Sequence, residues 1–215
     1  MTVIEFGSGR DGAALGAFLQ RLLHFDKSAA VRVVGVGHAL AAYGGPPFGG
    51  RPVLALRLAA LKPETPAFDL TVAAGALLEG MAADDRALNL PPPLTGGPSW
   101  AGLLPPRTGW TRLGLVAVRA LAQAANEGNA DFRFRALGLD RSGLDALGEE
   151  IWSRAVPAAA GEDGVSTLAL RTAHAAHALG FLGPDPENSE EFAPLAGIGR
   201  WLRLDAPYGT VLQRD

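Results

Sequence analysis

Apolar residues recur at helical spacing near the start of the chain. Five of them stand at positions i, i+3, i+4, i+7 and i+8: Leu15, Phe18, Leu19, Leu22 and Leu23. This spacing forms one apolar face of a helix, and Asp11 precedes it at a suitable position for a cap. The pattern predicts an amphipathic helix.

Strand patterns follow this helix. Residues 30–43 are rich in Val and small residues. Residues 53–61 place Leu54, Leu56 and Leu58 on one side of a strand and Arg57 on the other. A connector rich in Gly and Pro, residues 44–50, separates them, so we expect an antiparallel hairpin with a long loop. Residues 68–72 predict a third strand, and residues 73–81 have the composition of a helix.

A proline-rich segment interrupts these patterns. Residues 89–109 contain six prolines and four glycines among 21 residues, which excludes a helix or a central strand through them. Because Trp100, Leu103 and Leu104 are apolar enough to pack, we expect an ordered strap, with Trp100 and Trp110 largely buried.

Helical patterns dominate the rest of the chain. Three helices are predicted: residues 113–126 with a continuation at 130–137, residues 144–155 capped by Ser142, and residues 167–179 capped by Ser166. Residues 198–204 and 210–213 then flank a turn and predict a terminal hairpin, and a long loop precedes this hairpin. No internal repeat of 20 to 50 residues is visible.

The fold class expected from these patterns is α+β. It comprises an N-terminal helix with a small antiparallel sheet, the Pro/Gly-rich strap, and a C-terminal helical region that ends in a β-hairpin. We expect an α+β subdomain over residues 1–88, the strap over 89–109 and a helical subdomain over 110–215. One compact domain overall is the alternative.

Composition and charge narrow the classes of function. The chain has 215 residues, 48% of them hydrophobic and 19% charged, so a folded globular protein is expected. The absence of cysteine excludes disulfides, thiolate zinc sites and cysteine nucleophiles. We find no signal or membrane-spanning pattern and expect a cytoplasmic protein. The net charge is −3, divided as +1 up to residue 107 and −4 beyond it, which gives no basic excess for phosphate binding.

Two glycine-rich segments resemble nucleotide-binding loops only in part. The segment that begins at Gly35 lacks the third small residue of a dinucleotide fingerprint, because Leu40 stands there. Glycines inside a strand are the better interpretation. The loop at residues 44–50 lacks the Gly-Lys-Ser/Thr ending of a phosphate-binding loop.

Histidines supply the one candidate metal site. His174 and His177 stand three residues apart on a predicted helix, so both rings could approach one ion. The sequence marks no third ligand, and a polar stripe on an alanine-rich helix is the plainer interpretation. We therefore expect neither a metal nor another cofactor.

Catalytic patterns are missing as well. Paired carboxylates such as Glu149 and Glu150 are adjacent in sequence, and adjacent residues diverge by about 100° around a helix. No Gly-x-Ser-x-Gly elbow occurs. We expect these carboxylates to be surface charges and lean against an enzyme.

The order of helices followed by a hairpin matches a winged helix-turn-helix. In that interpretation the last helix would read DNA through Arg171, and the hairpin would contribute Arg200 and Arg203. The acidic charge of this half and the long connectors weaken the interpretation.

Several strings of residues together resemble a family of conserved, uncharacterised actinobacterial proteins of unknown function. They are Arg21-Leu22-Leu23, Ala29-Ala30-Val31-Arg32, Pro46-Pro47-Phe48-Gly49, Trp100-Ala101-Gly102-Leu103-Leu104-Pro105-Pro106, His174-Ala175-Ala176-His177-Ala178-Leu179-Gly180-Phe181-Leu182 and Gly199-Arg200-Trp201-Leu202-Arg203. The resemblance implies no activity, ligand or site residue.

The sequence therefore leads to one expected function and one alternative. We expect a non-enzymatic binding or protein-interaction protein, whose partner is another protein or a second copy of the chain, with neither membrane nor nucleic acid. The alternative is a DNA-binding transcriptional regulator with a C-terminal winged helix.

The histidine pair gives a first testable expectation. Added zinc should leave the melting temperature within a degree or two, because only tight binding to the native state raises it by mass action. Thermal unfolding with and without zinc measures this. A large rise that His174→Ala abolishes would contradict the expectation.

Overall fold

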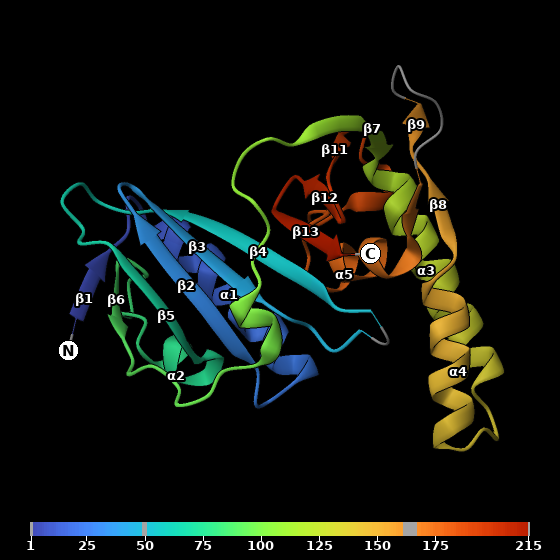
Figure 1. Ribbon diagram of the computed structural model, residues 1–215, viewed down its shortest axis with the longest axis horizontal. Coiled ribbons are helices and arrows are strands. Elements are labelled where there is room, and N and C mark those ends of the chain that lie inside the picture. Colours follow the sequence, from blue (N-terminus) through green and yellow to red (C-terminus); the bar gives the residue numbers. More distant parts are fainter. Residues whose placement is uncertain (1, 49–50, 161–166, 215) are drawn as a thin grey trace. The chain divides into compact units, whose positions relative to one another are not determined.

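The computed structural model describes residues 2–48, 51–160 and 167–214 (Figure 1). The chain divides into two compact units. Unit 1 comprises Met1–Pro47 and Leu54–Leu104, and unit 2 comprises Phe48–Val53 and Pro105–Asp215. The fold class is α+β with antiparallel sheets, and the chain ends in a strand hairpin.

Unit 1 is built around a four-stranded antiparallel sheet in the order β5-β2-β3-β4. Its strands are β2 (Ala30–Val36), β3 (Ala39–Gly44), β4 (Val53–Ala60) and β5 (Phe68–Ala73). A separate two-stranded sheet pairs β1 (Thr2–Glu5) with β6 (Ala87–Leu90). The hairpin of β3 and β4 with its long loop agrees with the sequence pattern.

Helix α1 (Gly9–Phe25) covers one face of this sheet. Leu15 and Leu19 are fully buried on its inner side, as the helical spacing predicts. The helix comes so close to β3 that a Cβ atom at Gly44 would lie 2.5 Å from Leu22. Glycine at this position therefore permits the packing of the helix on the sheet.

The helix begins differently from the prediction. Ser8 is its N-cap residue, and Asp11 instead accepts hydrogen bonds from the Ser8 hydroxyl at 2.5 Å and from the Ala60 amide at 2.9 Å. These bonds lower the pKa of Asp11. The carboxylate thus ties α1 to the end of β4.

The strap contains regular structure that its prolines did not suggest. Strand β6 extends to Leu90, and a short 3-10 helix, η1, spans Ser99–Gly102. Trp100 and Trp110 are half-buried rather than largely buried. The Arg32 guanidinium pairs with Asp69 at 2.7 Å and also donates to the carbonyl of Ala101, which attaches η1 to the sheet of unit 1.

Unit 2 contains a second antiparallel sheet, in the order β13-β12-β11-β7-β9. Its strands are β7 (Thr111–Ala117), β9 (Ala159–Ala160), β11 (Phe192–Ile198), β12 (Trp201–Ala206) and β13 (Gly209–Arg214). Strands β8 (Ala155–Pro157) and β10 (Thr167–Ala169) form a separate pair.

Two helices of unit 2 pack through small residues. Ala122 and Ala125 of α3 (Val118–Arg135) are buried, as are Ala173 and Ala176 of α5 (Leu170–Ala178). A Cβ atom at Gly128 would lie 2.7 Å from Leu170, so the two helices approach closely there. Helix α4 (Arg141–Trp152) forms a hairpin with α3 (Figure 1).

The same junction between a strand and a helix occurs three times. Ala73, Ala117 and Ala169 each end a strand and are the N-cap residue of α2 (Ala74–Glu79), α3 and α5, with φ between −64° and −73° and ψ between 131° and 144°. In each case the next amide donates to a backbone carbonyl of another segment, at 2.7 to 2.9 Å. Each helix is therefore positioned by its preceding strand, a structural repetition that the sequence did not reveal.

Four sequence-based element assignments are wrong. Residues 113–117 form β7 instead of helix, and residues 167–169 form β10. Gly37, at φ 59°, forms a turn between β2 and β3 and does not lie within a single strand. The long loop expected before the terminal hairpin contains most of β11 (Phe192–Ile198). The predicted cap Ser166 lies outside the described residues, and the cap of α4 is Asp140, which accepts from the Gly143 amide at 2.8 Å.

Burial of Leu170 yields a stability prediction. Its side chain is only 4% exposed and packs where α3 and α5 meet, so Leu170→Ala should lower the free energy of unfolding by about 2–5 kcal/mol. Urea denaturation measures this change. Phe134→Ala is the control, because Phe134 is 79% exposed, and it should change stability by less than about 0.5 kcal/mol. Equal losses in both variants would contradict the packing.

Candidate functional site

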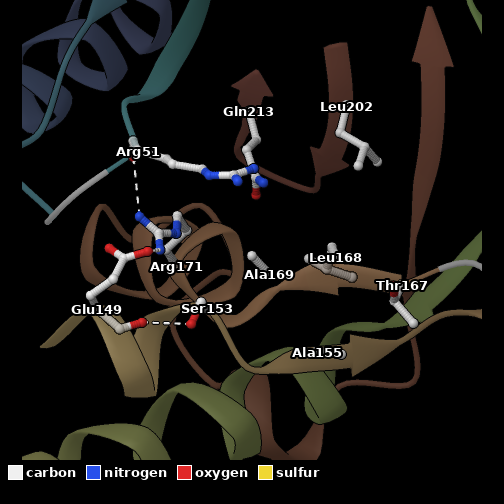
Figure 2. Close-up of a pocket in the computed structure, with 10 residues that line it drawn as sticks. All are labelled: Arg51, Glu149, Ser153, Ala155, Thr167, Leu168, Ala169, Arg171, Leu202 and Gln213. Atoms are coloured by element: carbon white, nitrogen blue, oxygen red, sulfur yellow. Dashed lines mark hydrogen bonds and ion pairs between the residues drawn. The ribbon is translucent and has the colours of Figure 1, made fainter. Parts of the chain in front are cut away.

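A cavity of about 310 Å³ lies within unit 2 (Figure 2). It is bounded by the start of α5, the end of α4, strands β8 and β10, the last two strands and the segment before β4. Ten residues line it: Arg51, Glu149, Ser153, Ala155, Thr167, Leu168, Ala169, Arg171, Leu202 and Gln213.

A buried guanidinium forms one wall of the cavity. Arg171 is 1% exposed, and its Nη2 donates to Glu149 Oε1 at 2.8 Å. Its Nη1 donates to the backbone carbonyl of Arg51 at 3.4 Å. Among the residues that the structure describes, Nε of Arg171 has no hydrogen-bond acceptor. A buried cation with an unused donor therefore lies at the cavity.

The start of α5 places this arginine. Helix α5 follows β10 directly, and the Leu170 amide donates to the Arg154 carbonyl at 2.7 Å. Its N-cap residue, Ala169, has no side chain that can accept from the first turn. The positive end of the helix therefore contributes to the cavity wall.

Hydrogen bonds hold two further lining residues, Gln213 and Ser153, in place. Thr172 Oγ1 donates to Gln213 Oε1 at 2.6 Å, and both residues are buried, so β13 is fixed to α5. Ser153 donates its hydroxyl to the carbonyl of Glu149 at 2.6 Å. Figure 2 shows the Arg51 side chain extending across the cavity toward Gln213.

The charges of these groups do not cancel. Arg51 and Arg171 contribute two positive charges and Glu149 contributes one negative charge. The Glu149 side chain is 48% exposed, so water screens it more than it screens Arg171. The charged side chains among the described lining residues therefore sum to +1.

His174 lies near this cavity between two aromatic rings. Its ring stacks on Trp152 with centroids 4.4 Å apart and meets Phe48 edge-on at 4.7 Å. Burial, and to a smaller extent His177, lower the pKa of His174 to about 4. Burial also lowers the pKa of His177. Both rings are therefore neutral at pH 7.

The predicted metal pair acquires no further ligands. Across the described segments, no cluster of three or more His, Asp or Glu residues could hold a metal ion. His174 lies against aromatic rings, and His177 is half-buried.

The three arginines expected at a DNA surface have different surroundings. Arg171 is buried and ion-paired. Arg203 pairs with Asp205 at 2.8 Å and lies 5.7 Å from the Trp110 ring centre. Arg200 is exposed in the turn between β11 and β12, beside a second hollow of about 370 Å³.

Other cavity residues were not recognised in the sequence. Glu149 was assigned to surface charge as one member of an adjacent pair, and Arg51 and Gln213 were not considered. These residues are separated by up to 162 positions along the chain, and only the fold brings them together. Arg171, a basic residue on the alanine-rich α5, was the one available signal.

The described helices include none that is long and apolar enough to cross a membrane. This observation concerns only the part of the chain that the structure describes.

The pKa of His174 predicts a pH dependence of stability. The folded value of about 4 lies below the ordinary 6.5, so the unfolded chain takes up the proton first as the pH falls. Stability due to neutral His174 is complete above pH 6.5 and is lost between pH 6.5 and 4. His177 acts in the same direction.

We expect the free energy of unfolding to be about 1–2 kcal/mol lower at pH 5 than at pH 7.5 through His174. His174→Phe keeps an aromatic ring between Trp152 and Phe48 but cannot titrate, so it should show a smaller fall. Urea denaturation at the two pH values measures both. The same fall in the variant and the wild type would contradict the assignment.

Solved structures with a similar fold are sliding clamps of DNA polymerase. The clamp from Pseudomonas aeruginosa, solved with a ligand, gives a TM-score of 0.56 at 11% identity, covering 99% of this chain and 63% of that one. DNA polymerase III subunit beta from Borrelia burgdorferi, in complex with a natural product, gives a TM-score of 0.55 at 8% identity. This match covers 100% of the present chain and 64% of the Borrelia chain. The chain thus spans about 63% of the length of these clamps, and at such identities the likeness concerns the fold alone.

This fold corrects the function expected from the sequence. The likeness to sliding clamps covers 99% of the chain, so the unspecified binding protein is corrected to a clamp-like protein-interaction fold, and the alternative winged-helix regulator is wrong. The supposed recognition helix α5 carries a buried Arg171, and the supposed wing, β12 and β13, belongs to a larger sheet.

Family comparisons place both halves of the chain among proteins of unknown function. No curated protein matches the chain. Residues 1–102 match the model described as Domain of unknown function (DUF8010), and residues 105–215 match Domain of unknown function (DUF8185). The expected resemblance is confirmed at this level, and the actinobacterial origin stays a prediction. Because the second match covers more than half of the sequence, the chain belongs to the DUF8185 family.

Proposed function

We propose that this chain is a subunit of a clamp-type assembly that encloses DNA. The observation that carries the proposal is the likeness of its fold to DNA polymerase sliding clamps over 99% of its residues. Sliding clamps encircle DNA. The expectation that nucleic acid is not a partner is therefore set aside.

The repeated strand-to-helix junctions support a modular architecture. Two of them place α3 and α5 in unit 2, and one places α2 in unit 1. In each unit, antiparallel strands are combined with helices that begin directly at the end of a strand. Units of this kind suit an assembly built from repeated modules.

The length of the chain favours several copies. Because it covers only 63% of one matched clamp chain, we expect a closed assembly to need more than one copy. The expected homo-oligomer would then be a closed assembly of several copies around DNA.

The charge distribution determines how DNA would be held. Helix α1 exposes Arg10 and Arg21, but the whole chain has a net charge of −3. Tight sequence-independent binding needs several phosphates neutralised by basic residues, and no such excess exists here. We therefore propose that enclosure, more than phosphate pairing, keeps the protein on DNA.

Assembly and topology give the test. Light scattering after gel filtration should show more than one copy per particle. Dilute protein that is concentrated in the presence of a nicked circular plasmid should then co-elute with the plasmid, because the assembly closes around it. A single cut of the plasmid by a restriction enzyme should release the protein, because the closed assembly can then slide off the free DNA ends.

Salt and two variants provide the controls. Retention on the circle should change little between about 50 and 200 mM salt, whereas binding through phosphates falls steeply over this range. Arg10→Gln and Arg21→Gln together should preserve retention on the circle. A monomer at every concentration, or equal retention on circular and linear DNA, would contradict the proposal.

A further inference from the structure

We propose that the cavity of unit 2 binds a carboxylate carried on an apolar stem, such as an acidic side chain or the C-terminus of a peptide. The ten lining residues that the structure describes all belong to unit 2, so the proposal uses one copy of the chain. It does not depend on the proposed assembly around DNA.

The position of Arg171 argues for a ligand. A guanidinium that is 1% exposed loses its hydration, and it stands in the first turn of α5, where the helix dipole disfavours a cation. Its ion pair with the half-exposed Glu149 compensates only part of this cost. An anion in the cavity would supply the missing favourable interaction.

The unused donor indicates where such an anion would bind. Buried polar groups of folded proteins nearly always have hydrogen-bond partners. Nε of Arg171 has none among the described residues, although its two terminal nitrogens both donate. Nε is closed to water in this structure, so a carboxylate oxygen would reach it only after the neighbouring side chains shift, and the planar group would then match a guanidinium edge.

The charge of the site selects a monovalent anion. Two arginines and one glutamate give a net charge of +1, which one carboxylate neutralises. A phosphate dianion would leave a net negative charge next to Glu149. Arg51 extends across the cavity toward Gln213 (Figure 2), and its guanidinium is the second positive charge near a bound carboxylate.

The remaining wall suits an apolar stem. Leu168, Leu202, Ala155 and Ala169 contribute aliphatic surface next to the charged groups. A volume of about 310 Å³ is at the lower end for small-molecule pockets and accommodates one or two side chains. A carboxylate with an aliphatic group therefore fits better than a bare inorganic ion.

The Arg171 side chain provides a direct readout. Its Nε–Hε group gives a resonance in a ¹H–¹⁵N correlation spectrum of the full chain, assigned by triple-resonance experiments. The first probes are acetyl-Leu-Leu with a free carboxylate and the same peptide as its amide. The second pair is acetyl-Leu-Glu-Leu-amide and its Gln counterpart, and inorganic phosphate is a fifth probe.

We expect either free carboxylate to shift the Arg171 Nε–Hε resonance in a saturable manner, and neither amide to do so. The tighter of the two acids identifies the source as a chain terminus or an acidic side chain. Phosphate should bind more weakly than both.

Variants connect the shift to the site. Arg51→Gln retains Arg171 and should weaken binding of the tighter acid at least tenfold. Arg112→Gln is the matched control, because Arg112 is an exposed arginine of β7 outside the cavity, and it should leave the affinity unchanged. Both variants are compared with the wild type by circular dichroism to verify folding.

Four results would overturn the proposal. They are no shift with either acid at concentrations on the order of 10 mM, equal shifts with acids and amides, tighter binding of phosphate, and unchanged affinity in folded Arg51→Gln. None of them bears on whether the chain assembles around DNA.

Discussion

One buried guanidinium connects distant segments of unit 2. Arg171 joins three segments that are distant in sequence: its own helix α5, helix α4 through Glu149, and the segment before β4 through the carbonyl of Arg51. The neighbouring Thr172 adds β13 through Gln213. Burying a charge is costly unless partners surround it, so this arrangement requires all of these segments to be in place together. The cavity is the space that they leave between them.

The sequence predicted those elements whose pattern is local. Helix α1 and the hairpin of β12 and β13 follow from spacing and turn residues, because one face of each is buried in its own unit. Strand β7 was predicted as helix because short apolar runs do not distinguish the two structures. Strand β11 was missed. It contains Pro194, which pairs with Leu115 of β7, whereas the pairing with β12 begins only at Leu195. The proline therefore lies where its missing amide is not needed by β12.

The candidate site was beyond the reach of sequence patterns for a different reason. Arg51, Glu149 and Gln213 have no motif relationship, and each alone is indistinguishable from a surface residue. Arg171 was named only in the winged-helix interpretation, as an exposed contact with DNA. Its burial results from the packing of α5 against α3 and β13, a tertiary constraint that helical spacing does not encode. Sequence reasoning identified the residue and assigned it the wrong environment.

The same arginine links ligand binding to stability. A buried ion pair contributes little net stability, because desolvation offsets much of its attraction. The pair of Arg171 and Glu149 is thus poorly explained as a device for folding alone, and its unused Nε makes this explanation weaker still. An anion that binds only the folded chain would add its binding free energy to that of folding. Because Arg171 contacts α4 and the segment before β4, an anion bound to Arg171 would then stabilise the contacts between α5 and both of these segments.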